Sequence, residues 1–143
     1  MAKLRRKIME QAGIVVVHKN KTLRSHLVNF LAQEGLKILA DFDSLAELRA
    51  NARASNPGVI LLDAELLRDE SEGYLEDLKQ ALPEVKLVLT GPDPQAHYSR
   101  HIGTLGADLY LSEGLDPRAW TKKLKAAAAA AFVSALRRVG DQD

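Results

Sequence analysis

The fold of this chain is decided by the stretch Pro57–Asp63, which reads PGVILLD. Four apolar residues follow the turn-forming Pro57 and Gly58 without interruption, and Asp63 ends the run. A continuous apolar run of this length is typical of a strand that is buried on both faces. Such strands occur in parallel sheets that helices cover on both sides, so strands and helices should alternate. Asp63 should then lie at the carboxyl edge of the sheet, where open α/β folds bind their ligands.

The composition fits one ordinary soluble domain. The chain has 143 residues, of which 46% are hydrophobic and 27% are charged. A net charge of +1 favours neither a nucleic-acid-binding protein nor an acidic scaffold. The absence of cysteine excludes disulfides and thiolate metal sites. No segment approaches the ~20 apolar residues of a membrane helix, and the first residues lack the apolar core of a signal peptide. We therefore expect a cytoplasmic protein that does not contact a membrane.

Strand and helix patterns alternate along the whole chain. Besides the central run, strands are predicted at Ile14–Val17, Leu36–Ala40, Val85–Thr90 and Leu109–Leu111. Apolar stripes at helical spacing predict five helices, at about 23–34, 45–52, 75–82, 98–105 and 117–139. Thr22 is the expected N-cap of the first helix, and Asp116-Pro117 opens the last. Glu65–Gly73 reads as a polar loop. The pattern predicts an α/β fold with one doubly wound, five-stranded parallel sheet and right-handed crossovers.

Polar residues from four strands should converge on the carboxyl edge of this sheet. A merely structural edge has no need of this convergence, so the edge is the candidate site. Neither a Gly-rich nucleotide fingerprint nor a phosphate-loop pattern is present. The residues at the edge are His18 and Lys19, Asp63, Thr90 and Gly91, and Ser112 and Glu113.

The order of these motifs resembles the receiver domain of bacterial two-component response regulators, over about residues 13–137. VILLD at 59–63 is similar to the strand that carries the phosphoacceptor, here Asp63. LVLTG at 87–91 matches the strand whose Thr90 would contact the phosphoryl group. GADLYLS at 106–112 matches the fifth-strand motif, with Tyr110 as the aromatic that turns inward on activation, and IVVVHK at 14–19 followed by Leu23-Arg24 matches the first strand and helix.

The resemblance implies a domain plan and a sheet order. The flavodoxin-like strand order of the family is 2-1-3-4-5. The chain then divides into a basic N-terminal extension at 1–12, a receiver-like domain at 13–139 and a tail at 140–143.

The chain departs from the family at the positions that hold the metal. Where receivers have two acids that bind magnesium, this chain has His18 and Lys19, and Glu113 replaces the lysine that ends the fifth strand. Phosphoryl transfer to a carboxylate depends on neutralisation by magnesium and a cation. Magnesium binds through carboxylates and water, so neutral His18 is a poor ligand and Lys19 repels the ion. The site keeps its acceptor and loses its metal, which indicates a degenerate receiver, or pseudo-receiver.

An exchange of charges suggests what replaces the metal. The family places acids at the end of the first strand and a lysine at the end of the fifth, and this chain has Lys19 and Glu113 there. A carboxylate at a partly buried edge is costly unless it is paired. We therefore expect the Lys19 ammonium to contact Asp63, Glu113 or both.

The leading functional hypothesis is a stand-alone signalling module that acts through protein–protein contacts, without enzymatic activity, cofactor or metal. The alternative is a working phosphoacceptor at Asp63 in a phosphorelay. That alternative would require magnesium and a histidine kinase, and would bring phosphotransfer and autophosphatase activity. A third hypothesis, nucleic-acid or membrane contact through Lys3, Arg5, Arg6 and Lys7, has no aromatic interleaving or motif to support it.

The last predicted helix suggests a homodimer. Ala126–Ala131 is a run of six alanines, and alanine is the strongest helix former. The helix is longer than such a sheet needs, and its end carries Phe132, Val133, Leu136 and Val139. Trp120 is expected in the core or in an interface.

Two further sets of residues have weaker metal-site patterns. His97 and His101 lie four apart on a predicted helix, but no third ligand accompanies them, which favours surface histidines. Asp41 and Asp43 follow the second strand, where a helix cap and a solvated loop acid are the favoured roles.

Overall fold

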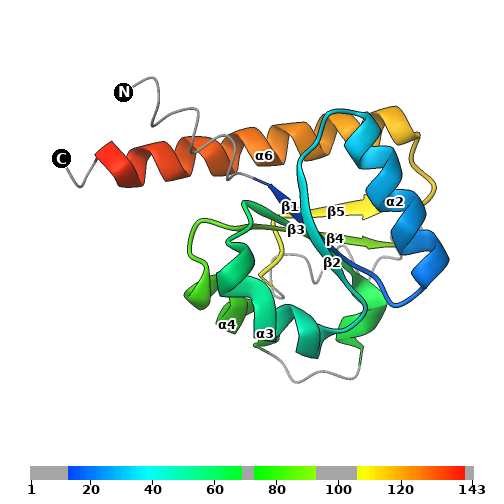
Figure 1. The fold of residues 1–143 in the computed structure, drawn as a ribbon, viewed down its shortest axis with the longest axis horizontal. Helices are drawn as coiled ribbons and strands as arrows, with labels where there is room; N and C mark the ends of the chain where they lie inside the picture. The colour runs from blue at the N-terminus through cyan, green and yellow to red at the C-terminus, as the bar shows by residue number, and fades with distance from the viewer. Residues whose placement is uncertain (1–12, 69–72, 93–105, 141–143) are drawn as a thin grey trace.

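The computed structural model describes residues 13–68, 73–92 and 106–140 (Figure 1). From residue 14 to residue 91 the described strands and helices alternate as the sequence predicts. The described elements are β1 (Ile14–Val17), α2 (Lys21–Gln33), β2 (Ile38–Phe42), α3 (Leu45–Ser55), β3 (Val59–Asp63), the 3-10 helix η1 (Ala64–Leu67), α4 (Tyr74–Ala81), β4 (Lys86–Gly91), β5 (Leu109–Ser112) and α6 (Pro117–Gly140).

The five strands form one parallel sheet in the order β2-β1-β3-β4-β5. This order and the doubly wound α/β architecture confirm the sequence prediction. The stretch that decides the fold becomes β3, the central strand, which pairs with β1 on one side and with β4 on the other. All five of its residues are buried, as a strand covered on both faces requires.

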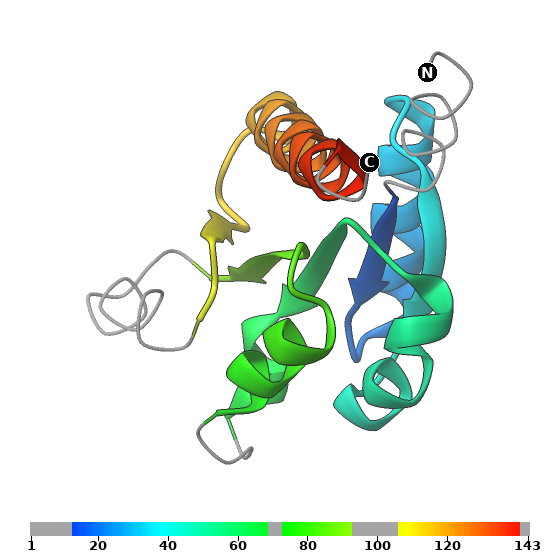
Figure 2. The same ribbon diagram turned by 90° about the vertical axis from the view of Figure 1, so that its left-hand side faces the viewer.

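Helices cover both faces of the sheet, and the sheet separates the core into two clusters (Figure 2). Successive strand residues point to opposite faces, so Val15 and Val17 of β1 belong to one cluster and Ile14 and Val16 to the other. The first cluster packs against α3 and α4. The second packs against α2 and α6, with Leu31, Trp120 and Leu124 buried in it. Each strand is thus fixed by apolar contacts on both sides.

The second strand begins two residues later than predicted, because the preceding residues complete the end of α2. Gly35 adopts φ +90°, and its N–H donates to the carbonyl of Ala32 at 3.1 Å. The N–H of Leu36 donates to the carbonyl of Leu31, also at 3.1 Å, which closes a Schellman motif. Leu36 and Leu31 pack in the same core cluster. Leu36 therefore belongs to the helix terminus, and β2 starts at Ile38.

Three further predictions concern helix positions. Thr22 as the first N-cap is wrong, because the side chain of Asn20 accepts from the N–H of Leu23. The Asp116-Pro117 start of the last helix is confirmed, since Asp116 accepts from the N–H of Arg118 and α6 begins at Pro117. The helix predicted at 98–105 lies outside the described residues, which contain four α-helices.

The predicted loop 65–73 begins with a short helix, since η1 covers Ala64–Leu67. In the described part of the chain, no helix combines the length and apolar character that crossing a membrane requires.

One substitution at two positions of α2 tests the packing. Leu31→Ala should lower the free energy of unfolding by about 2–5 kcal/mol, because it leaves a cavity in the second core cluster. Leu31 is 0% exposed, whereas Leu23 is 48% exposed. Leu23→Ala should therefore change the free energy of unfolding by less than about 0.5 kcal/mol. Urea denaturation of both variants measures the difference. Equal effects would contradict the assignment of Leu31 to the core.

Candidate functional site

Buried polar side chains gather at the carboxyl edge of the sheet. Among the described residues five polar side chains are buried, and four of them stand at the ends of strands β1, β3, β4 and β5. The fifth, Thr121, lies in α6, where its hydroxyl donates to the carbonyl of Pro117. Buried polar groups need partners, so this concentration marks the edge as the candidate site. The four are His18, Asp63, Thr90 and Ser112.

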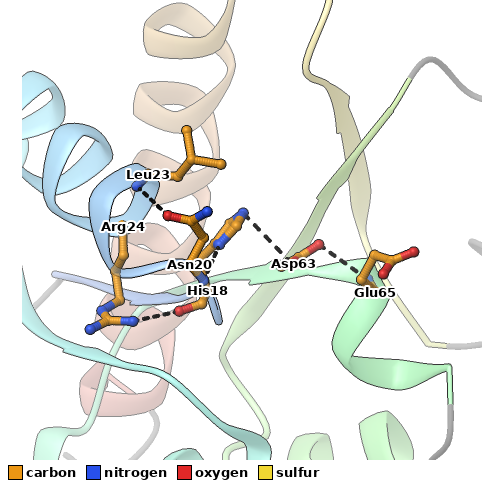
Figure 3. A network of polar contacts seen from close by, with 6 residues as sticks. All are labelled: His18, Asn20, Leu23, Arg24, Asp63 and Glu65. Atoms are coloured by element: carbon orange, nitrogen blue, oxygen red, sulfur yellow. Dashed lines mark hydrogen bonds and ion pairs between the residues drawn. The ribbon is translucent and has the colours of Figure 1, made fainter.

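His18 and Asp63 face each other across the boundary between β1 and β3 (Figure 3). The Nε2 atom of His18 lies 3.6 Å from Oδ2 of Asp63. This is longer than a hydrogen bond and short enough for electrostatic attraction. The other carboxylate oxygen, Oδ1, accepts from the backbone N–H of Glu65 at 3.1 Å and so caps η1. Asp63 is 6% exposed and His18 is 8% exposed, so both groups are largely removed from water.

The beginning of α2 fixes the orientation of the His18 ring. The backbone N–H of Asn20 donates to Nδ1 of His18 at 3.0 Å. An Nδ1 that accepts carries no proton, so the neutral ring has its proton on Nε2, the nitrogen that faces Asp63. Because the side chain of Asn20 also caps α2, the start of that helix and the imidazole are held by one residue. Asn20 was not among the predicted site residues, although Asn directly before a helix is a strong N-cap signal.

Arg24 links the same edge to β2 through hydrogen bonds. Its guanidinium donates to the carbonyl of His18 at 2.7 Å and to Oδ2 of Asp41 at 2.8 Å. The arginine side chain is 13% exposed, so this pair is partly shielded from solvent. The Asp41 carboxylate is therefore paired with the Arg24 guanidinium. Neither Asp41 nor Asp43 caps α3, a role that the side chain of Ser44 fills.

The expectation that Lys19 pairs with Asp63 or Glu113 is wrong. Both Lys19 and Glu113 are exposed, and Asp63 has His18 and the Glu65 N–H as its partners. The described ion pairs include none formed by Lys19 or Glu113. Burial of an ammonium costs more free energy than burial of a neutral imidazole, which is why the histidine points inward.

Thr90 and Tyr110 complete the edge on the side of β4 and β5. Thr90 is buried and is the register partner of Asp63 in the sheet. Tyr110 lies across Gly91, so closely that a Cβ at that position would clash with its hydroxyl. The hydroxyl of Tyr110 donates to the carbonyl of Pro92 at 2.7 Å. The predicted phosphoacceptor and switch positions thus lie on three adjacent strands, as the resemblance implies.

The donor set at this edge does not fit magnesium. At the end of β1, where a carboxylate would be needed, stands the His18 imidazole, whose available nitrogen carries a proton. Lys19 beside it is cationic, and Asp63 is the one buried carboxylate of the described residues. No group of three or more His, Asp or Glu side chains in the described ranges is arranged to hold a metal ion. Hard cations need several oxygen ligands, which these residues do not offer.

Several predicted residues fall elsewhere. His97 and His101 lie outside the described residues, as do the basic residues of the N-terminal extension, Lys3, Arg5, Arg6 and Lys7. Trp120 is buried in the core, and its Nε1–H donates to the carbonyl of Ser112 at 2.8 Å. This bond ties the end of β5 to the first turn of α6.

Comparison with known proteins gives one curated relative and many similar structures. No protein-family model matches the chain. The transcriptional regulatory protein DegU of Brevibacillus brevis is 26% identical over 116 residues, which are 80% of this chain. The match covers 49% of DegU, so the chain spans about half the length of that relative.

Several solved structures have the same fold, among them a receiver domain. A response regulator receiver domain protein (CheY-like) from Methanospirillum hungatei superimposes with a TM-score of 0.72 at 20% identity, covering 85% of this chain and 96% of that one. A putative pilus assembly-related protein from Burkholderia pseudomallei gives 0.74 at 19% identity, with 85% and 92% covered. NtrX from Brucella abortus gives 0.75 at 19% identity, with 92% and 30% covered. The resemblance to receiver domains is confirmed in the fold.

The contact between Tyr110 and Gly91 yields a prediction. Gly91→Ala should push the Tyr110 hydroxyl off the Pro92 carbonyl and lower the free energy of unfolding by about 1 kcal/mol, the value of a typical hydrogen bond. In a Tyr110→Phe background the same substitution should cost less than about 0.5 kcal/mol, because the hydroxyl is gone. Denaturation of the four proteins of this cycle measures both costs. Equal costs in the two backgrounds would contradict the contact.

Proposed function

We propose that this chain is a receiver-like signalling domain that acts through protein–protein contacts and is not controlled by phosphorylation of Asp63. The observation that carries the proposal is the contact between His18 and Asp63. An imidazole with its Nε2–H toward the carboxylate stands at the position where receivers have an acid. The fold and the similarity to DegU support a signalling role, and the altered edge supports one without metal chemistry.

The chemistry of phosphoryl transfer explains why this exchange matters. The incoming phosphoryl group and the Asp63 carboxylate are both anionic, so their approach requires a compact, multiply charged cation. A neutral His18 provides no such charge, and exposed Lys19 is a monovalent group whose side chain is directed to water. The Glu65 N–H already binds one oxygen of Asp63. Asp63 is better suited to hold the edge in one state than to accept a phosphoryl group.

A working phosphoacceptor is the second candidate, and one observation favours it. Thr90 is the register partner of Asp63 and is buried beside it, which is the arrangement that the resemblance requires for contact with a phosphoryl group. In that case magnesium would be the cofactor and a histidine kinase the partner.

Titration with magnesium separates these two candidates. Millimolar magnesium chloride should produce no saturable amide NMR shifts around Asp63, and acetyl phosphate should leave no phosphoaspartate detectable by mass spectrometry. His18→Asp combined with Lys19→Asp should create saturable magnesium shifts, because it supplies the missing carboxylates.

Two outcomes decide against the first candidate. Saturable shifts or a phosphoaspartate in the unmodified chain would establish the second candidate instead. Addition of Asp63→Asn to the double variant serves as the control, since it should abolish the gained shifts if the ion binds at this edge.

Self-association through α6 is a further part of the proposal. The helix has 24 residues, which corresponds to about 36 Å, and it runs well past the strands (Figure 1). Val133 in its second half is 45% exposed, and Phe132 and Leu136 are half-buried. An apolar surface on a projecting helix suits contact with a second copy.

Charge on this surface should prevent a dimer. Sedimentation velocity at high protein concentration should show a dimer for the unmodified chain and a monomer for Val133→Asp combined with Leu136→Asp, because burial of unpaired carboxylates is costly. Glu34→Asp, an exposed change at the end of α2, is the matched control and should leave the dimer intact. A monomer at every concentration would rule the interface out, as would a dimer that survives both charges.

A further inference from the structure

A groove of about 370 Å³ opens beside the edge, between α2 and the beginning of α6. Its floor is formed by ends of β1 and β4, and its walls by one face of α2 and by the segment that joins β5 to α6. The volume lies within the range of small-molecule sites in proteins. The lining residues are His18, Leu23, His26, Leu27, Phe30, Thr90, Glu113, Leu115, Pro117 and Trp120.

Apolar side chains on both walls face the open space of the groove. Leu23 on α2 is 48% exposed and Leu115 is 36% exposed, and both line it. Together with Val133 they are the large hydrophobic residues that are most exposed in the described ranges. Two aromatic residues also line the groove, Phe30 of α2 and Trp120 of α6. An apolar body inserted here would bury surface that is now in contact with water.

The polar lining has one charge sign. Glu113 contributes an exposed carboxylate, and the buried Asp63 lies behind His18, which forms part of the floor. Of the described residues that line the groove, none is Lys or Arg. A cationic group is therefore favoured over an anionic one. The hydroxyl of Thr90 and the imidazole of His26, which also line the groove, add hydrogen-bonding groups.

We propose that this groove is a binding site for a small molecule with an aromatic or apolar body and a protonated amine. The body lies between Leu23 and Leu115 and over Trp120, and the amine faces Glu113. This site is separate from phosphorylation of Asp63 and goes beyond the signalling role proposed above. It provides the domain with a chemical input that does not require metal.

Binding can be followed through Trp120, because it is the one tryptophan of the chain and lines the groove. The probes are 2-phenylethylamine and 3-phenylpropanoate, which share an aromatic body and differ in charge. At pH 8, the amine should change the tryptophan fluorescence saturably with a dissociation constant of about 1 mM or tighter, as expected for a ligand of this size. The carboxylate should bind at least about fivefold more weakly. Amide NMR should place the amine-induced shifts at residues 23–30 and 113–120.

Two pairs of matched variants test the two halves of the ligand. Leu115→Ser should weaken amine binding about fivefold, because it removes apolar contact, whereas Val133→Ser on the far part of α6 should not change it. Glu113→Gln should weaken amine binding about threefold and reduce the preference over the carboxylate. Glu34→Gln, at another exposed acid, should change neither. All four sites are exposed, so the variants should fold, and thermal denaturation checks this.

Each other outcome overturns the proposal. Absence of saturable binding by either probe removes the site, and equal binding of amine and carboxylate removes the ligand class. Shifts that lie away from residues 23–30 and 113–120 place binding elsewhere, as does an amine dissociation constant that Leu115→Ser leaves unchanged. If the groove residues shift on dilution without any ligand, the occupant is a second copy of the chain.

Discussion

A carboxylate buried at the end of a strand that is covered on both faces is the constraint on which the site depends. Asp63 occupies this position because the four residues before it, Val59–Leu62, are fully buried in the centre of the sheet. A buried charge without partners costs several kcal/mol, so neighbouring segments must supply them. One partner comes from the segment directly after β3, the N–H of Glu65 in η1. The other comes from the end of the neighbouring strand β1, the imidazole of His18. Both segments therefore supply partners for the Asp63 carboxylate.

The partner that comes from β1 is itself held on two sides. Asn20 donates to the ring of His18 and caps α2, while Arg24 binds the carbonyl of His18 and the carboxylate of Asp41. The edge is consequently a chain of contacts from β2 through α2 to β3. A metal centre that takes part in chemistry must leave coordination positions open to water or substrate. Here Oδ1 of Asp63 accepts from the N–H of Glu65 and Oδ2 faces the His18 ring, and these two contacts are the basis for our proposal that the edge acts without a metal.

The sheet could be predicted from the sequence because its signals are local. Apolar runs bounded by Gly, Pro or polar residues marked the strands, and their order along the chain placed Asp63 at the edge. Local signals could not show which of His18 and Lys19 contacts Asp63. Adjacent residues at the end of a strand point in opposite directions, so only one of the two faces the carboxylate. Matching of charges favoured Lys19, but its ammonium is better solvated in water, and the N–H of Asn20 selects the imidazole. Thr22 was predicted as the cap, because the contact between Asn20 and His18 that joins the helix start to the sheet does not show in the local sequence pattern.

Helix α6 connects the edge with the exposed apolar surface around Val133. Trp120 in its first turns lines the groove and donates to Ser112 at the end of β5, and Val133 is exposed about 20 Å farther along the same helix. A ligand can shift a conformational equilibrium only by binding one state better than another. The ligand that we propose would lie against Trp120, whose hydrogen bond to Ser112 holds the start of α6 to the sheet. Because the helix is continuous from Pro117 to Gly140, a change in how its first turn packs on the sheet would move the whole helix, including its far end. The hydrogen bond between Trp120 and Ser112 can be formed or broken. A ligand in the groove that favours one of these two states would therefore affect the exposed surface of α6.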